Sequence, residues 1–215
     1  MFPDNQQSSE AKKKALTVGI AQYIKEIGRG PRGAKPLTRA QATDLFGQVL
    51  DGTVTDLEIG AFCLAMRIKG ETSEEMAGFL DATHARLNRI PATQRPLIVL
   101  PSYNGARKLP VLTPLLALLL ARNGLPVLVH GTATEDRRVS SQDVLAALDI
   151  APMQALDEIE PGHVAFAPTA LLLPGLERLL DVRRTLGLRN SAHSLVKLMD
   201  PLAPVAGDSL IVGSY

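Results

Sequence analysis

The sequence predicts an α/β protein in which a small helical N-terminal domain, residues 1–95, precedes a parallel-sheet α/β domain, residues 96–215. Two observations predict this class. Three helix-start motifs follow one another in the first ninety residues, and after Pro91 short apolar runs alternate with helical segments. Because 46% of the 215 residues are hydrophobic, the chain can bury a core and is expected to fold.

The helical domain is expected to contain four helices. Over residues 16–27 apolar residues recur at helical spacing, and Gly28 follows as a stop signal. Helices are then expected over 38–50, 55–69 and 72–88, each opening with a threonine followed three residues later by Gln or Glu. In such a capping box both side chains satisfy free backbone amides at the helix start. The apolar stripes of these helices predict that they pack on one another.

The α/β domain is expected to alternate strands with helices. Short apolar runs predict strands at 97–100, 126–130, 163–167 and 209–212. Helical patterns predict helices at 113–123, 141–148, 174–186 and 190–199. Strand–helix–strand units of this kind form parallel sheets with right-handed connections and helices on both faces.

Several features predict a cytoplasmic protein. The single cysteine, Cys63, lies within an apolar helical pattern and can form no internal disulfide. The N-terminal residues are polar and then basic, unlike a signal peptide. The longest apolar run ends at Arg122 after about a dozen residues, the length of a buried helix rather than a membrane span.

Charge is unevenly distributed along the chain. The net charge of +1 argues against a uniformly basic nucleic-acid-binding protein, yet Lys12–Lys35 contains seven Lys or Arg residues and one acid, Glu26. Such a run is most often a solvated tail and helix end. It is also the composition of a segment that contacts phosphates.

Two loops are expected where ligands bind in parallel sheets, at the carboxyl ends of the strands. Residues 101–108 occupy the position of a phosphate-binding loop but contain one glycine, Gly105, instead of several. The neighbouring Arg107 and Lys108 either bind phosphate through their side chains or are surface cations. The loop 130–138 begins with His130 and Gly131, which are either ligand contacts or a buried histidine beside a turn.

A third segment, residues 182–201, concentrates cations. Arg189, His193 and Lys197 are four residues apart and would share one face of the predicted helix 190–199, either as a phosphate-binding stripe or as a solvated face. The sequence contains no serine-protease triad, HExxH pair, CxxC motif or Walker loop. It therefore predicts no catalytic residue and no metal site.

Three segments resemble the anthranilate phosphoribosyltransferases, which share glycosyltransferase family 3 and its fold with the class II nucleoside phosphorylases. They are residues 49–79, 127–150 and 182–189, and the resemblance extends over nearly the whole chain from about residue 38. It implies a helical domain onto which residues 170–200 pack, a homodimer through that domain, and phosphoribosyl diphosphate with magnesium in the cleft.

The chain departs from this family at the donor-phosphate site. Its 101–108 segment replaces the family's glycine-rich diphosphate loop, and Thr132-Ala133 replace the family's Asn-Arg after His-Gly. Asp136 and Arg137 stand where the family has paired serines. The family's acidic metal-binding pair would fall beyond residue 215, so the C-terminal part of the family fold is expected to be missing.

The strings at 25–30, 101–122 and 189–198 resemble one divergent branch, the YbiB-type proteins. That resemblance implies loss of the transferase reaction and sequence-independent nucleic-acid binding in a basic groove of a homodimer. The phosphate-contact candidates are Arg29, Arg32, Lys35, Arg107, Lys108, Arg183, Arg184, Arg189 and Lys197. The candidates for the former substrate cleft are Tyr103, Asn104, Gly105, His130, Gly131, Asn190 and His193.

Three hypotheses follow for the function. The first is a non-catalytic homodimer that binds nucleic acid, DNA in particular, and needs no cofactor. The second is a pentosyltransferase of the anthranilate phosphoribosyltransferase type that uses magnesium and phosphoribosyl diphosphate. The third is a dimerisation module for a protein partner.

Overall fold

The computed structural model describes residues 19–91, 93, 95–103, 105–106, 108–135, 137–202 and 208–213. The candidates Asn104 and Arg107, and the basic residues 12–14, lie outside these described residues. The helical part contains α2 (Ala21–Ile27), α3 (Arg39–Asp51), α4 (Asp56–Lys69) and α5 (Ser73–His84). All three predicted capping boxes are present, at the starts of α3, α4 and α5.

Three phenylalanines form the centre of the helical part. Phe46 of α3 stacks on Phe79 of α5 with ring centroids 4.7 Å apart, and Phe62 of α4 packs edge-on against both rings. All three side chains are fully buried. The apolar faces of these helices are therefore satisfied by one another, as their periodicity predicts.

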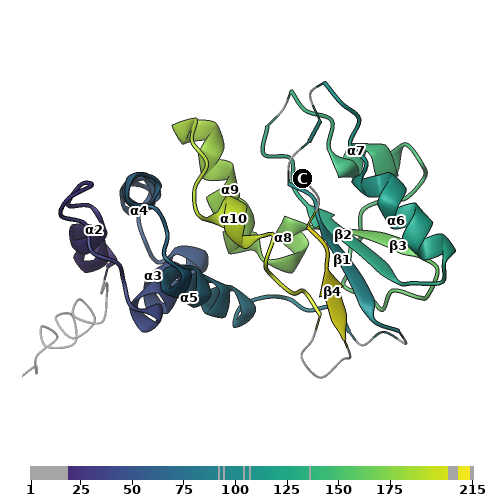
Figure 1. Cartoon of the computed structure of the whole chain (residues 1–215), viewed down its shortest axis with the longest axis horizontal. Helices are drawn as coiled ribbons and strands as arrows, with labels where there is room; N and C mark the ends of the chain where they lie inside the picture. Colours follow the sequence, from purple (N-terminus) through teal and green to yellow (C-terminus); the bar gives the residue numbers. More distant parts are fainter. Residues whose placement is uncertain are drawn as a thin grey trace, which may run out of the picture.

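The second part is a four-stranded parallel sheet in the order β3-β2-β1-β4. Its strands are β1 (Leu97–Pro101), β2 (Val127–Gly131), β3 (Val164–Pro168) and β4 (Ser209–Ile211). The connections β1–β2 and β2–β3 carry α6 (Thr113–Arg122) and α7 (Ser141–Ala146), which cover one face of the sheet (Figure 1).

Alternate residues of the strands enter two different cores, because side chains alternate across a sheet. Ile98 and Val129 belong to the core under α6 and α7. Val99 and Leu128 belong to the core that continues into the helical part. The sheet is thus buried on both faces, as expected for parallel strands.

The chain then returns towards the helical part through α8 (Thr169–Leu172), α9 (Pro174–Leu186) and α10 (Ala192–Leu195), which lie between the sheet and α3–α5 in Figure 1. A Cβ added at Gly175 would collide with the carbonyl oxygen of Leu50, so α9 and α3 approach closely at this glycine. This packing connects the two parts of the chain.

Two predicted helices end four residues earlier than expected. The helix predicted over 190–199 is only α10, because the amides of Lys197 and Leu198 bond three residues back in turns instead of continuing the α-helical ladder. The helix predicted over 72–88 ends at His84, and the amides of Asn88 and Ile90 bond instead to carbonyls 84 and 111 residues further along the chain, those of Leu172 and Pro201. Local turns therefore end the first helix early, and tertiary hydrogen bonds end the second.

Candidate functional site

The loops that follow β1 and β2 approach each other closely at the carboxyl ends of these strands. The Ser102 amide donates to the His130 carbonyl at 2.8 Å, and a Cβ added at Gly131 would collide with the Ser102 carbonyl oxygen. Between them the described residues line a cavity of about 10 Å³, formed by Ser102, Gly105, Thr132, Ala133, Thr134, Glu135, Arg138 and Ser140. That is room for about one water molecule.

Tyr103 and His130 form a buried hydrogen-bonded chain with Thr169. The Thr169 hydroxyl donates to the Tyr103 hydroxyl at 3.0 Å, and that hydroxyl lies 2.9 Å from Nδ1 of His130. Burial raises the pKa of Tyr103 and lowers that of His130 to about 3, so both are neutral at pH 7. This arrangement favours the interpretation of His130 as a buried structural histidine.

Arg183 and Arg184 hold the loop after β2 against α9. Arg183 donates to Glu135 at 2.8 Å and to the Thr134 hydroxyl at 3.2 Å. Arg184 donates to Asp181 at 2.6 Å and to the Ala133 carbonyl at 2.7 Å. These two candidates therefore make contacts within the chain that a bound phosphate would have to share.

The other cations of this segment line a pocket between the C-terminal end of α4 and α10, here called the cationic pocket. Its volume is about 250 Å³, and its lining residues are Met66, Arg67, Gly70, Glu71, Arg189, Asn190, His193, Ser194 and Lys197. The structure thus brings four sequence-predicted candidates together: Arg189, Asn190, His193 and Lys197. It adds Arg67, which lies in the last turn of α4.

The pKa values of Arg189 and His193 are lowered first by burial and then by neighbouring cations. Burial, followed by the nearby charges of Arg183, Arg138 and Arg67, lowers the pKa of Arg189. Burial and neighbouring cations also lower the pKa of His193 to about 4, so this histidine is neutral at pH 7. An anion bound here would reduce the repulsion among the cations.

Asn190 orders one wall of the cationic pocket. Its side-chain nitrogen donates to the Leu179 carbonyl at 2.7 Å, and its side-chain oxygen accepts from the Ala192 amide at 3.2 Å. Nδ1 of His193 lies 3.1 Å from that oxygen. The start of α10 is therefore fixed to the end of α9, which positions the residues on either side of it.

The basic loop 28–37 is fastened beside the same region. The Leu37 amide donates to Glu75 at 2.8 Å, and Glu75 forms a buried ion pair with Lys69 at 2.6 Å. Lys69 directly precedes Gly70, which lines the cationic pocket. The loop that carries the exposed candidates is thus attached to the α4–α5 turn.

The remaining candidates are placed at two separate positions. Arg29, Arg32 and Lys35 are exposed on the α2–α3 loop, and Arg29 forms an ion pair with Glu26 at 2.6 Å. Lys108 is exposed on the loop after β1, in the α/β part. The structure does not bring Lys108 into the cationic pocket.

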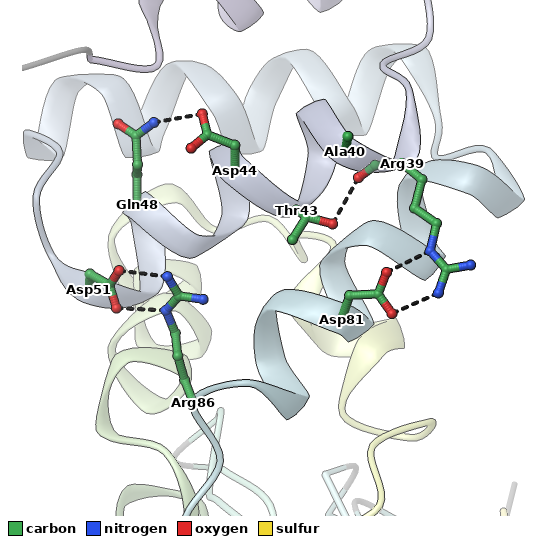
Figure 2. A pocket seen from close by; sticks show the side chains of 8 residues that line it. All are labelled: Arg39, Ala40, Thr43, Asp44, Gln48, Asp51, Asp81 and Arg86. Atoms are coloured by element: carbon green, nitrogen blue, oxygen red, sulfur yellow. Dashed lines mark hydrogen bonds and ion pairs between the residues drawn. The ribbon is translucent and has the colours of Figure 1, made fainter.

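A larger concave surface on α3 and α5 has a different charge pattern (Figure 2). It measures about 780 Å³, and its two arginines are each bound by an aspartate. Arg39 meets Asp81 with contacts of 2.5 and 2.8 Å, and Arg86 meets Asp51 with contacts of 2.6 and 2.7 Å. These paired charges leave this surface without the cation excess that an anion site needs.

Comparisons with known proteins agree with this architecture. Residues 21–86 match the helical bundle domain of the glycosyl transferase family. The Escherichia coli (strain K12) protein YbiB, described as uncharacterized, is 42% identical over 199 residues, which cover 90% of this chain and 62% of YbiB. The anthranilate phosphoribosyltransferase of Methanosarcina acetivorans is 33% identical over 85% of this chain and 50% of its own length.

The solved structures show the same fold. The anthranilate phosphoribosyltransferase (TrpD) of Thermus thermophilus matches with a TM-score of 0.70 and 21% identity, covering 88% of this chain and 57% of that one. Residues 21–86 therefore form the helical bundle domain of the glycosyl transferase family, and the chain has the anthranilate phosphoribosyltransferase fold. Within that family it falls in the branch of YbiB.

The chain spans about half to three-fifths of the length of these relatives. Among the described residues, no helix has the length and apolar character needed to cross a membrane.

Proposed function

We propose that this chain binds nucleic acid, DNA in particular, through phosphate groups and without catalysing a reaction. The cationic pocket carries this proposal, because Arg67, Arg189 and Lys197 come together there from two separate parts of the chain. Cations that contact phosphates position a nucleic acid but do not read its sequence. Binding is therefore expected to be independent of sequence and sensitive to salt.

The close approach of the loops after β1 and β2 argues against the rival proposal of a pentosyltransferase. Phosphoribosyl diphosphate with magnesium would need space at the carboxyl ends of the strands, where the cavity measures about 10 Å³. This small space is the observation that speaks against a bound diphosphate in the described part of the chain.

A transferase assay separates the two proposals. Incubation with phosphoribosyl diphosphate, anthranilate and magnesium should consume no more diphosphate substrate than a heat-treated sample. Enzyme-dependent turnover would contradict the non-catalytic proposal and show that the loops after β1 and β2 separate.

An exposed apolar stripe on α4 supports a homodimer through the helical part. Leu57, Leu64 and Ile68 are 84%, 48% and 56% exposed. They are seven and four residues apart and so share one face of the helix. Apolar side chains gathered on one exposed face mark an association surface. We propose that a second copy of the chain covers this stripe.

Nucleic-acid binding is tested with charge-removing variants of the pocket. Fluorescence anisotropy with a labelled mixed-sequence oligonucleotide should show that the double variant Arg189→Gln, Lys197→Gln binds at least about tenfold more weakly than the original chain, a change of about 1.4 kcal/mol. The matched control is Arg122→Gln, which removes an exposed cation at the end of α6 and should change affinity less than about twofold. Equal losses of affinity in the double variant and in Arg122→Gln would contradict the assignment of phosphate binding to the cationic pocket.

A further inference from the structure

We infer that the carboxylate of Glu135 is an internal competitor for phosphate, because it occupies a second anion site that Arg138 and Arg183 form near the cationic pocket. The inference rests on the proposed function and concerns how the access of phosphate to the protein is limited. Three observations carry it: the contacts of Glu135, an unsatisfied hydrogen-bond donor, and the burial and charge of the three side chains.

Two arginines from separate segments converge on one oxygen of Glu135. Oε2 of Glu135 lies 2.8 Å from Nη2 of Arg183 and 2.8 Å from Nε of Arg138. Arg183 extends from α9, whereas Arg138 lies in the same loop after β2 as Glu135. Guanidinium groups that meet at one oxygen can bind a carboxylate or a phosphate. These distances therefore describe an anion site in which Glu135 is the anion.

Glu135 does not satisfy the two arginines equally. Arg183 donates a hydrogen bond to its carboxylate. The Nε–H group of Arg138 is buried and has no hydrogen-bond partner among the described residues, although Oε2 of Glu135 lies 2.8 Å away. A buried donor without an acceptor costs free energy. A phosphate holds its oxygens in a tetrahedron rather than in a plane, so it can offer a different oxygen to each arginine.

Burial and charge make this site attractive to anions. The side chains of Arg138, Arg183 and Glu135 are 22%, 18% and 19% exposed, so their charges are screened less than charges at the surface. Two positive charges and one negative charge give the three side chains a net charge of +1. The positive charge continues towards the cationic pocket, because burial and then the charges of Arg183 and Arg138 lower the pKa of Arg189. A strand held at the cationic pocket is therefore attracted to the second site as well.

Glu135 keeps phosphate out of this second site. The cavity that Glu135 and Arg138 help to line measures about 10 Å³, which is room for about one water molecule. Phosphate therefore reaches the two arginines only when the Glu135 side chain withdraws. Glu135 lies outside the helices and strands, so its withdrawal breaks neither kind of element. Binding at this site is thus an exchange of one anion for another.

The experiment compares Glu135→Gln with the original chain by fluorescence anisotropy, using a labelled single-stranded, mixed-sequence oligonucleotide. Glutamine keeps an acceptor oxygen for the arginines but removes the negative charge. Because charged hydrogen bonds are roughly twice as strong as neutral ones, Glu135→Gln should bind the strand at least about fivefold more tightly at physiological salt. Its slope of log K against log salt concentration should steepen by about 0.7, the value for one more phosphate contact on a single strand.

Two further variants serve as controls. Glu177 also fastens the loop after β2, because it accepts a hydrogen bond from Thr132 at 2.6 Å. Glu177→Gln removes the same charge from this region and should change affinity less than about twofold, since screening weakens effects between charges that are not in contact. The double variant Glu135→Gln, Arg183→Gln should return to within about twofold of the original affinity, because the two substitutions act on one site.

The outcomes separate this inference from the proposed function. An affinity of Glu135→Gln equal to or below that of the original chain would overturn the inference and leave phosphate binding at the cationic pocket intact. An equal gain in Glu177→Gln, or a gain that persists in the double variant, would also overturn it. No binding by the original chain or by Glu135→Gln at low salt would overturn both.

A second substitution decides the question if Glu135→Gln does not fold. Glu135→Asp keeps the negative charge but shortens the side chain by one methylene group, which draws the carboxylate away from the two arginines. It should bind the strand at least about twofold more tightly than the original chain, because its contact with the arginines is weakened rather than removed. An unchanged or lower affinity of Glu135→Asp would overturn the inference.

Discussion

The guanidinium of Arg183 joins two parts of the chain that are 48 residues apart in sequence. From α9 it reaches Glu135 and Thr134 in the loop after β2, and Glu135 also pairs with Arg138 at 2.8 Å. Both side chains of the Arg183–Glu135 pair are less than one-fifth exposed. Their contact is therefore shielded from solvent more than a surface ion pair is.

Arg183→Ala should lower the free energy of unfolding by about 1–3 kcal/mol, because the partly buried Glu135 loses a charged hydrogen-bond partner. Urea denaturation measures the change. The control Arg122→Ala removes an exposed cation and should stay within about 0.5 kcal/mol of the original chain. Equal midpoints for the two variants would contradict the structural role of Arg183.

Two buried histidines should make stability depend on pH. The folded chain holds the pKa of His130 at about 3 and that of His193 at about 4, whereas the pKa of an unfolded histidine is about 6.5. As the pH falls from about 6.5 to about 5, the unfolded chain therefore binds protons that the folded chain does not. The free energy of unfolding should fall by up to about 1.4 kcal/mol per pH unit for each histidine.

Urea midpoints measured between about pH 7.5 and about pH 5 test this dependence. His193→Gln should have a shallower slope, by up to about 1.4 kcal/mol per pH unit, because one depressed pKa is removed. A slope that the substitution leaves unchanged would contradict the burial of this histidine among cations.

At the scale of elements, the contact between α9 and α3 depends on a glycine. A Cβ at Gly175 would meet the Leu50 carbonyl oxygen, whereas a Cβ at Gly60 in α4 would meet nothing within 4 Å. Gly175→Ala should therefore destabilise the chain by more than about 1 kcal/mol through overpacking. Gly60→Ala should be neutral or stabilising by up to about 1 kcal/mol, since alanine favours helices.

Thermal denaturation of the two glycine variants gives matched measurements, because the chemical change is the same at both sites. Similar melting temperatures would show that α9 and α3 are not packed as described.

Local signals explain which elements the sequence could predict. The capping boxes at Thr38, Thr55 and Thr72 depend only on residues three apart, and all three helices start where expected. The short helix α8 was not predicted, and α10 ends early because the amides of Lys197 and Leu198 form three-residue turns, which the apolar spacing does not reveal. Element order was thus predictable, but element length was less so.

Some residues of the candidate site could be predicted from local spacing, whereas others depend on tertiary contacts. The four-residue spacing of Arg189, His193 and Lys197 pointed to a shared surface, and all three line one pocket, although no continuous helix joins them. Arg67 was missed, because its place in the pocket depends on the end of α4 meeting α10. The hydrogen bond from Arg184 to the Ala133 carbonyl could not be predicted from the sequence either, because Ala133 lies 51 residues away.

At the scale of the whole molecule, the exposed α4 stripe predicts self-association. Leu64→Glu places a charge in the proposed dimer contact and should shift the chain to a monomer in sedimentation velocity experiments. The control Leu148→Glu alters a leucine of similar exposure, 51%, beyond α7 and should leave the dimer intact. A monomeric original chain, or a dimeric Leu64→Glu variant, would contradict this surface.

Net charge describes this molecule poorly, because +1 is the sum of paired and clustered charges. Arginines on the α3–α5 surface are paired with aspartates, whereas cations outnumber acids in the cationic pocket. Phosphate binding should therefore be local, with a small number of counterions released. The number of released counterions distinguishes binding at the cationic pocket from non-specific binding over the whole protein surface.

The most direct test is the salt dependence of binding to a single-stranded, mixed-sequence oligonucleotide. Three phosphate contacts, by Arg67, Arg189 and Lys197, predict a slope of about −2 in a plot of log K against log salt concentration. Removing Arg189 and Lys197 should flatten the slope by about 1.4. An affinity that does not depend on salt concentration, or a slope that the two substitutions leave unchanged, would contradict phosphate recognition by this pocket.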